Sequence, residues 1–361
     1  MTRLFLRQPW LMLVLSAPCA FAHNAFESTA IVRLLTDRME IRMTTGLSTA
    51  RTIEAKGGDI TAFEPSMLPH LQSSLLANAD RLFEVISHNS PLVLGRAEVT
   101  FDPELETTFL LIYPRPPAGP LQLRANHVSK LPYGGTYLTI QGESGEVLAT
   151  GLLMAEVLSM EVVVPPINAA PVQSVAPSFT VFLRLGVEHI LTGYDHLLFL
   201  LGLLIACHRL RTMAGVVTCF TLAHSITLAL AALGLCSISG RIVEPLIATS
   251  ILFIGVENLL RRKEPPGRWA LTFGFGLIHG LGFASVLQNI GLGSSGRQLA
   301  LPLLAFNLGV ELGQLGVVLL LLPALWWLHK RPRYYNRGYA LISSGVACAG
   351  AYWLLQRTLL G

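Results

Sequence analysis

Four histidines and two carboxylates lie inside long apolar runs in the second half of the chain. They are His189, Asp195, His196, His224, His279 and Glu311. A charged residue at the centre of a bilayer costs about 2.5–3.5 kcal/mol on insertion scales, so each one needs a partner or a purpose. Imidazole together with carboxylate suits nickel, cobalt, zinc or iron. These residue types therefore predict a site for a divalent transition metal, with the six side chains as its ligands.

The segment His189-Ile-Leu-Thr-Gly-Tyr-Asp195-His196 carries the densest group. Its two histidines are seven residues apart, about two helical turns, which places them on one face of a continuous helix. Asp195 lies about 100° around that helix, where its carboxylate can accept a hydrogen bond from an imidazole and fix the tautomer. Counting about 1.5 Å per residue puts the other two histidines and Glu311 at a similar depth, so we expect all of them to meet.

Other polar residues of the same segments predict a path to this site. Asn307, Glu311 and Gln314 follow i, i+4, i+7 spacing and form one polar stripe on an otherwise apolar helix. Similar residues lie nearer the ends of the other segments. The expected outer shell or pathway consists of Glu188, Ser225, Glu244, Glu257, Asn258, Asn307 and Gln314.

Helix pairing is the alternative role for such residues, because interhelical hydrogen bonds stabilise a bundle by about 0.6 kcal/mol each. A single histidine favours pairing, whereas three or four histidines with two carboxylates at one depth favour a site. Copper(I) prefers thiolate or thioether ligands, and the chain has no methionine after Met213. It also has no GxxxxGK(S/T) phosphate loop, so no nucleotide is expected as the direct energy source.

The elements that must hold these residues are membrane-spanning helices. Of the 361 residues, 52% are hydrophobic and only 13% are charged, whereas about a quarter are charged in typical soluble domains. Six apolar segments are each long enough to cross about 30 Å of hydrocarbon: 180–206, 213–236, 242–260, 269–290, 299–328 and 338–356. Residues 180–361 are therefore predicted to form an all-α membrane bundle of about six helices in contact with the lipid bilayer.

The first 22 residues predict export of the segment after them. They combine two arginines, a short apolar run and Ala20-Phe21-Ala22, which is typical of a cleaved secretory signal peptide. Cleavage after Ala22 exposes His23 as the new terminus. Its amine and imidazole form a chelating pair that could capture metal outside the membrane.

Residues 23–164 have the pattern of a separate domain. They contain short β-prone runs bounded by Gly, Pro or Asp, including Leu153–Val164, and a helical period over Met67–Ile86. This pattern predicts a mainly β extracytoplasmic domain, either α+β or a β-sandwich, that offers a surface for a periplasmic partner. Residues 165–179 come next as a Pro-rich linker.

Basic residues predict the orientation of the bundle. Loops 207–212, 261–268 and 329–337 hold ten Lys and Arg, against two in the opposite loops. The positive-inside rule then places these three loops in the cytoplasm. We expect a bacterial inner-membrane protein whose N-terminal domain and C-terminus are periplasmic. Membrane topology accounts for the net charge of +4, so no nucleic-acid partner is expected.

The motifs HILTGYDH, FTLAHSITL, FGFGLIHGLGFA and FNLGVELGQ resemble those of the HupE/UreJ family. The resemblance covers about residues 180–325 and implies a nickel or cobalt permease of the bacterial inner membrane, associated with hydrogenase and urease maturation. It would make His189, Asp195 and His196 metal-handling residues. The chain differs from the short hydrogenase-linked members in carrying a long exported domain and in lacking their second His-Gly-rich motif, so it resembles the longer branch.

Three functions remain open from the sequence. The first is a divalent transition-metal permease that carries nickel, cobalt or zinc as cargo and is not an enzyme. The second is an intramembrane zinc-dependent hydrolase, because three histidines can hold a catalytic zinc with one open position. The third is a membrane scaffold whose exported domain binds a partner.

Overall fold

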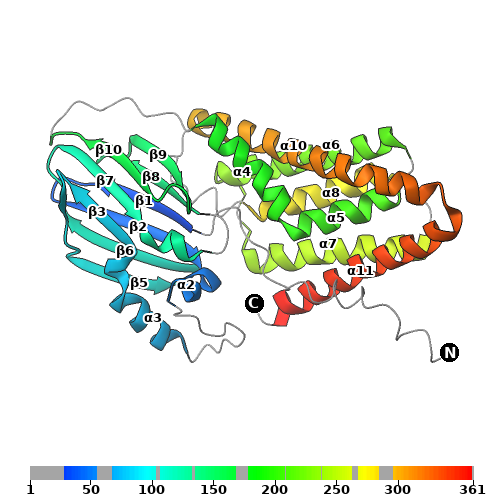
Figure 1. Cartoon of the computed structure of the whole chain (residues 1–361), viewed down its shortest axis with the longest axis horizontal. Helices are drawn as coiled ribbons and strands as arrows, with labels where there is room; N and C mark the ends of the chain where they lie inside the picture. Colours follow the sequence, from blue (N-terminus) through cyan, green and yellow to red (C-terminus); the bar gives the residue numbers. More distant parts are fainter. Residues whose placement is uncertain are drawn as a thin grey trace.

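The computed structural model joins a β-rich domain to a bundle of helices (Figure 1). It describes residues 28–54, 67–102, 106–131, 135–167, 178–207, 209–236, 238–261, 267–283 and 296–359. We call residues 28–164 the β-domain and residues 179–359 the helical bundle. Each has its own hydrophobic core, and the two meet where the Tyr137 ring lies 5.6 Å from that of Phe182.

Two sheets form the β-domain. The larger has the order β5-β6-β2-β1-β8-β9, with β1 antiparallel to β2 and parallel to β8, and the smaller has the order β10-β7-β3-β4. Alternating burial along β2 and β6 puts one face of the larger sheet into the core. The strands are β1 (Ser28–Leu34), β2 (Arg38–Gly46), β3 (Phe83–Ser87), β4 (Ser90–Pro91), β5 (Arg96–Phe101), β6 (Glu106–Pro114), β7 (Gly119–Ala125), β8 (Thr136–Gln141), β9 (Val147–Leu153) and β10 (Ser159–Val164).

The mainly β prediction is confirmed, although two of its segments are divided differently. The helical period over Met67–Ile86 yields only α3 (Leu68–Ala77), after which the chain makes a 3-10 turn and enters β3. The Asn78 side chain donates to Ser74 O at the end of α3. Leu153–Val164 comprises the last residue of β9 and the whole of β10, on either side of a turn. A second helix, α2 (Leu47–Glu54), comes directly after β2.

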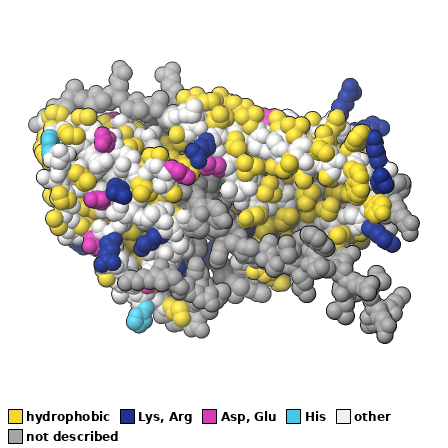
Figure 2. All heavy atoms as spheres, viewed as in Figure 1, with side chains coloured by type: hydrophobic (Ala, Val, Ile, Leu, Met, Phe, Trp, Pro, Cys, Tyr) yellow, Lys and Arg dark blue, Asp and Glu magenta, His cyan; other side chains and the backbone are white. Residues whose placement is uncertain are grey.

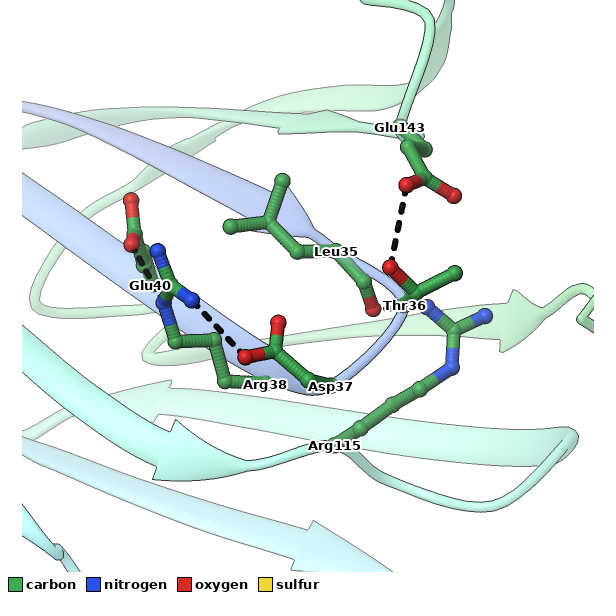
Figure 3. Close-up of polar contacts among 7 residues, drawn as sticks. All are labelled: Leu35, Thr36, Asp37, Arg38, Glu40, Arg115 and Glu143. Atoms are coloured by element: carbon green, nitrogen blue, oxygen red, sulfur yellow. Dashed lines mark hydrogen bonds and ion pairs between the residues drawn. The ribbon is translucent and has the colours of Figure 1, made fainter.

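Polar contacts hold the turn between β1 and β2 (Figure 3). Arg38 pairs with Asp37 at 2.8 Å and with Glu40 at 2.7 Å. Thr36 donates to Glu143 on the turn after β8. The Arg115 guanidinium donates to the carbonyl oxygens of Leu35 and Pro165, so it ties this turn to the chain that leaves the β-domain.

The helical bundle has the surface expected of a membrane domain. Figure 2 shows its visible face covered mainly by hydrophobic side chains, with Lys and Arg gathered at the end away from the β-domain. The helices are α4 (Phe179–Thr192), α5 (Tyr194–Ile205), α6 (Leu210–Ala232), α7 (Gly240–Arg261), α8 (Arg268–Leu281), α10 (Gly296–His329) and α11 (Pro332–Leu359). Four of them, α6, α7, α10 and α11, are long and apolar enough to cross a membrane, and α4 with α5 makes a fifth if the pair is one span.

The first apolar segment is broken, which the prediction of one continuous helix missed. Helices α4 and α5 meet at Gly193 with a bend of 68°. Gly193 has ψ of 89°, outside the helical range, and a Cβ there would lie 2.6 Å from His189 O. In the fourth predicted segment, α8 ends at Leu281, and residues 284–290 lie outside the described part.

Glycines bring three helix pairs into backbone contact, as small residues do in membrane bundles. A Cβ on Gly186 of α4 would lie 2.0 Å from Phe306 O of α10. One on Gly280 of α8 would lie 2.4 Å from His224 O of α6, and one on Gly350 of α11 would lie 2.4 Å from Leu252 N of α7. The first contact holds α4, which carries His189, against α10, and the second holds together α6 and α8, which carry His224 and His279.

Candidate metal centre

Three of the predicted histidines converge at the break in the first span. His189 lies in the last turn of α4, His196 in the first turn of α5 and His224 on α6. Each offers a ring nitrogen, and these three atoms all lie within 4.8 Å of one another. We call these residues the histidine triad. The bend at Gly193, rather than two turns of one helix, brings the first two rings to a centroid distance of 4.6 Å.

The triad is buried, and most of its nitrogens have no partner. Both ring nitrogens of His189 and His224, and Nε2 of His196, make no hydrogen bond with any described residue. Buried polar atoms are normally paired, so a cluster of unpaired ones indicates a missing ligand or water. A neutral imidazole keeps one nitrogen lone pair that can bind a metal. Each residue of the triad can therefore turn a nitrogen lone pair toward the point where the three rings converge.

His279 of α8 is the fourth ring of the cluster, with its centroid 5.1 Å from that of His196. Its Nε2 lies 2.9 Å from Ser250 Oγ, and Ser250 Oγ donates to Ile247 O. Because the serine proton is used on Ile247, Nε2–H of His279 must be the donor to Ser250. Nδ1 of His279 then keeps the lone pair, and it has no partner among the described groups.

Aromatic side chains surround the four imidazoles. Phe283 and Phe306 stack on each other and lie 4.9 and 5.5 Å from His189. Phe199 and Phe220 lie 4.9 and 5.3 Å from His279. This apolar wall excludes water and lowers the local dielectric, so charge inside the cluster interacts more strongly than it would in solvent.

Asp195 directly precedes His196 in the chain, but its carboxylate is engaged by another helix. Its Oδ2 accepts a 2.8 Å hydrogen bond from Arg357 of α11, and Oδ1 is buried without a partner among the described residues. Arg357 also lies 3.7 Å from Glu244 of α7 and donates to its carbonyl oxygen. Asp195 thus pairs with an arginine rather than with an imidazole, a partner that the sequence pattern did not indicate.

The three residues of the predicted polar stripe on α10 lie in different surroundings. Asn307 lies close to His224 and donates to Leu303 O, leaving its Oδ1 unpaired among the described groups. Gln314 is buried and accepts from Thr221 of α6 at 2.7 Å. Glu311 is half-buried and lies outside the triad. Ser225 donates to the backbone of its own helix.

Three of the remaining predicted residues, Glu188, Glu257 and Asn258, have polar partners outside the triad. Glu188 pairs with Arg184, and Glu257 lies 3.4 Å from Arg261. Asn258 donates to Gly202 O and accepts from Arg268, a buried arginine that the sequence pattern placed in a basic loop. The position of Arg268 just before an apolar segment did not indicate that its side chain would be buried. His23 lies outside the described residues.

Comparison with known proteins assigns the family. A family model described as HupE / UreJ protein matches residues 168–357, more than half of the chain. The chain belongs to the HupE/UreJ family. The resemblance of the sequence motifs is thereby confirmed. No match was found among curated proteins or among solved structures.

The part matched to the HupE/UreJ family contains the whole cluster. All four histidines, Asp195 and its partner Arg357 fall between residues 168 and 357, whereas the β-domain precedes the match. Family membership makes the chain a membrane protein related to nickel and cobalt transport. Every helix that carries a histidine of the cluster is therefore part of the HupE/UreJ region.

Proposed function

We propose that this protein is an inner-membrane permease for a divalent transition metal, with nickel or cobalt as its cargo. The observation that carries the proposal is the histidine triad, three buried imidazoles that surround a common space within an apolar bundle. Imidazole suits nickel and cobalt, and family membership points to the same metals. The triad is the primary ligand set, with His279 and Asp195 next to it.

The broken first span supports transport rather than static binding. Secondary transporters place their substrate sites at discontinuous helices, where unwound backbone and helix ends face the ligand. Here the break at Gly193 lies between two triad histidines, with Asp195 in the first turn of α5. An inward divalent cation gains about 4.6 kcal/mol per 100 mV of membrane potential, which can drive uptake.

The orientation proposed from the basic loops agrees with the shape of the molecule. The C-terminal end of α11 and the β-domain lie at one end of the bundle, and Lys and Arg gather at the other (Figures 1 and 2). We place the β-domain end in the periplasm and the basic end in the cytoplasm. Metal then reaches the triad from the side of the β-domain.

We expect His196→Ala to abolish nickel or cobalt uptake while the protein stays inserted at near-normal abundance. Loss of a direct ligand should weaken metal binding by more than the roughly 10- to 100-fold caused by loss of an outer-shell partner. Uptake of radioactive nickel and cobalt by cells, together with Co²⁺ binding by purified protein, measures both effects. His70→Ala, an exposed histidine of the β-domain, is the control and should match the parent.

Glu311→Gln tests whether Glu311 belongs to the transport pathway rather than to the metal ligands, because Glu311 lies on α10 outside the triad. We expect it to abolish uptake as well, while Co²⁺ affinity stays near that of the parent. Normal uptake in both variants would exclude the proposed site. Uptake lost together with protein abundance would instead favour helix pairing as the role of these residues.

A zinc hydrolase is the alternative that the triad also permits, because three histidines form the zinc site of some enzymes. It predicts tightly held zinc in the purified protein and no metal accumulation by cells. Metal content and radiometal uptake, measured on the same preparation, separate the two functions.

A further inference from the structure

Glu244, Arg357 and Asp195 form a chain of ion pairs that leads from the surface of the bundle to the residue before His196. We call these three residues the relay. Glu244 lies one turn into α7 and Arg357 two residues before the end of α11. The C-terminal end of α11 lies at the end of the bundle that faces the β-domain (Figure 1). The side chain of Glu244 is 60% exposed, whereas those of Arg357 and Asp195 are each 9% exposed. The relay therefore runs inward from Glu244 through Arg357 to Asp195, which directly precedes His196 in the chain.

Charge balance explains why Arg357 belongs there. In the empty site the neighbouring imidazoles are neutral ligands, so a buried Asp195 carboxylate needs a cation to compensate its charge. Arg357 supplies that cation through a 2.8 Å hydrogen bond to Oδ2. Its guanidinium is charged at every physiological pH, so the pair persists while the site is empty.

An incoming divalent metal changes this balance. The metal brings two positive charges next to the guanidinium, and the two cations compete for one carboxylate in an apolar setting. Asp195 Oδ1 is buried and has no partner among the described residues, so none of them competes with a metal for this oxygen. Glu244, whose Oε2 is already 3.7 Å from Arg357 Nε, offers the arginine a second carboxylate.

We propose that Arg357 is a tethered cation that exchanges with the cargo: it holds Asp195 while the site is empty and moves to Glu244 when metal takes Asp195. This proposal rests on the permease function argued above. Arg357 acts as a positioning residue, because it controls the availability of Asp195 without touching the metal. Return of Arg357 to Asp195 would then help to release the metal.

The test measures Co²⁺ affinity and Co²⁺ transport by full-length protein in lipid bilayers. Arg357→Gln removes the competing cation, so the Co²⁺ dissociation constant should fall about tenfold, within the range of coupled charged neighbours. Transport should nevertheless slow, because release loses its driving group. Glu244→Gln should have the opposite effect and raise the Co²⁺ dissociation constant, because the displaced arginine no longer finds a second carboxylate to neutralise its charge.

Three further variants complete the test. In an Asp195→Asn background, Arg357→Gln should no longer change the Co²⁺ affinity. Arg357→Lys in the otherwise unchanged protein keeps the positive charge and should bind Co²⁺ with near-parental affinity. Arg337→Gln, an exposed arginine of the same helix, is the control and should match the parent. A purely structural ion pair predicts lower thermal stability with no gain in affinity for any variant.

The outcomes separate this proposal from the permease proposal. If the parent binds Co²⁺ in a His196-dependent manner but folded Arg357→Gln binds it equally or more weakly, the exchange is wrong and the metal site stands. If Arg357→Gln does not fold, an unchanged affinity in Glu244→Gln overturns the exchange by itself. If the parent shows no His196-dependent binding, both proposals fail.

Discussion

At the scale of single residues, the site is defined by imidazoles whose lone pairs lack partners among the described groups. Ser250 decides the tautomer of His279 because it donates its own proton to Ile247 and can only accept from the ring. No described group decides the tautomers of His189 and His224 in this way. The proton of each of these two rings can therefore sit on either nitrogen, so either nitrogen can offer its lone pair to a metal.

Another buried histidine, His127 in the β-domain, illustrates the contrasting structural role. Its Nδ1 donates to Leu82 O at 3.1 Å, and its Nε2 accepts from Thr136 Oγ1 at 2.7 Å. In the neutral ring Nδ1 is the donor and Nε2 the acceptor, so both nitrogens are satisfied without a buried charge. The pKa of His127 is lowered to about 4, mainly by burial, with the hydrogen bond to the Leu82 carbonyl opposing the shift and the charge of Lys130 adding to it.

This pairing predicts that the β-domain loses stability in mild acid. The unfolded chain takes up a proton on His127 below about pH 6.5, whereas the folded state resists until about pH 4. The contribution of neutral His127 to the free energy of unfolding is therefore fully present above pH 6.5. It falls by roughly 3 kcal/mol as the pH drops to about 4. Urea unfolding of a fragment spanning residues 23–164, monitored by circular dichroism, measures this slope.

Two variants identify the residue responsible. His127→Phe should be less stable at neutral pH, yet it should lose the part of the pH slope that the histidine causes. His70→Gln, at an exposed position, should keep the parental slope. An unchanged slope in His127→Phe would show that other groups cause the acid sensitivity.

At the scale of elements, close contacts between helices position the histidine side chains of the cluster. Helices α4 and α10 cross where Gly186 and Gly309 face each other, and His189 lies one turn after Gly186. Helices α6 and α8 cross at Gly280, beside His279 and against the backbone of His224. Each glycine contact lies within one turn of a histidine of the cluster, so backbone packing and ligand geometry are coupled.

Gly309→Ala should therefore disturb both stability and metal binding. Its Cβ would lie 2.0 Å from Leu183 O, so α4 and α10 must separate. We expect a loss of about 1–3 kcal/mol, as for other overpacked positions, and weaker Co²⁺ binding because His189 moves with α4. Thermal unfolding in detergent and Co²⁺ titration measure the two effects.

Gly316→Ala is the matched control on the same helix, because a Cβ there meets nothing within 4 Å. It should be as stable as the parent or slightly more stable, since alanine favours the helix. Equal melting temperatures for the two variants would contradict a role for the Gly186–Gly309 contact.

At the scale of the whole molecule, two domains with separate cores share one short junction. Tyr137 of β8 packs with Phe182 of α4 and joins the core of the bundle. The C-terminal end of α11, which carries Arg357 of the Asp195–Arg357–Glu244 relay, lies toward the same end of the bundle (Figure 1). The β-domain is therefore placed near the side from which we propose that metal reaches the cluster.

The proposed orientation predicts the behaviour of reporter fusions. A reporter that works only in the cytoplasm should be active when fused after Arg261, at the end of α7, and silent when fused after Ser239, before α7 begins. The reason is the concentration of Lys and Arg in the loops at the end of the bundle away from the β-domain. A reporter that works only in the periplasm should give the reverse pattern. Activity in the cytoplasm at Ser239 would invert the orientation and the direction of transport.

The sequence by itself determined the class of the molecule and the residue types of its site. Apolar runs, basic loops and β-prone segments are local patterns, because lipid contact and strand pairing act on every few residues along the chain. For the same reason the four histidines stood out, since each is a polar residue in an apolar run. Family membership confirmed the motifs that contain them.

Only the tertiary structure decided which of those residues meet. Gly193 breaks a helix that hydropathy reads as continuous, because its backbone angle and close contact with His189 O are invisible to composition. Asp195 pairs with Arg357, which lies 162 residues later in the chain. Glu311 is not part of the triad. These outcomes depend on how helices cross, and crossing is set by close contacts between residues far apart in the chain.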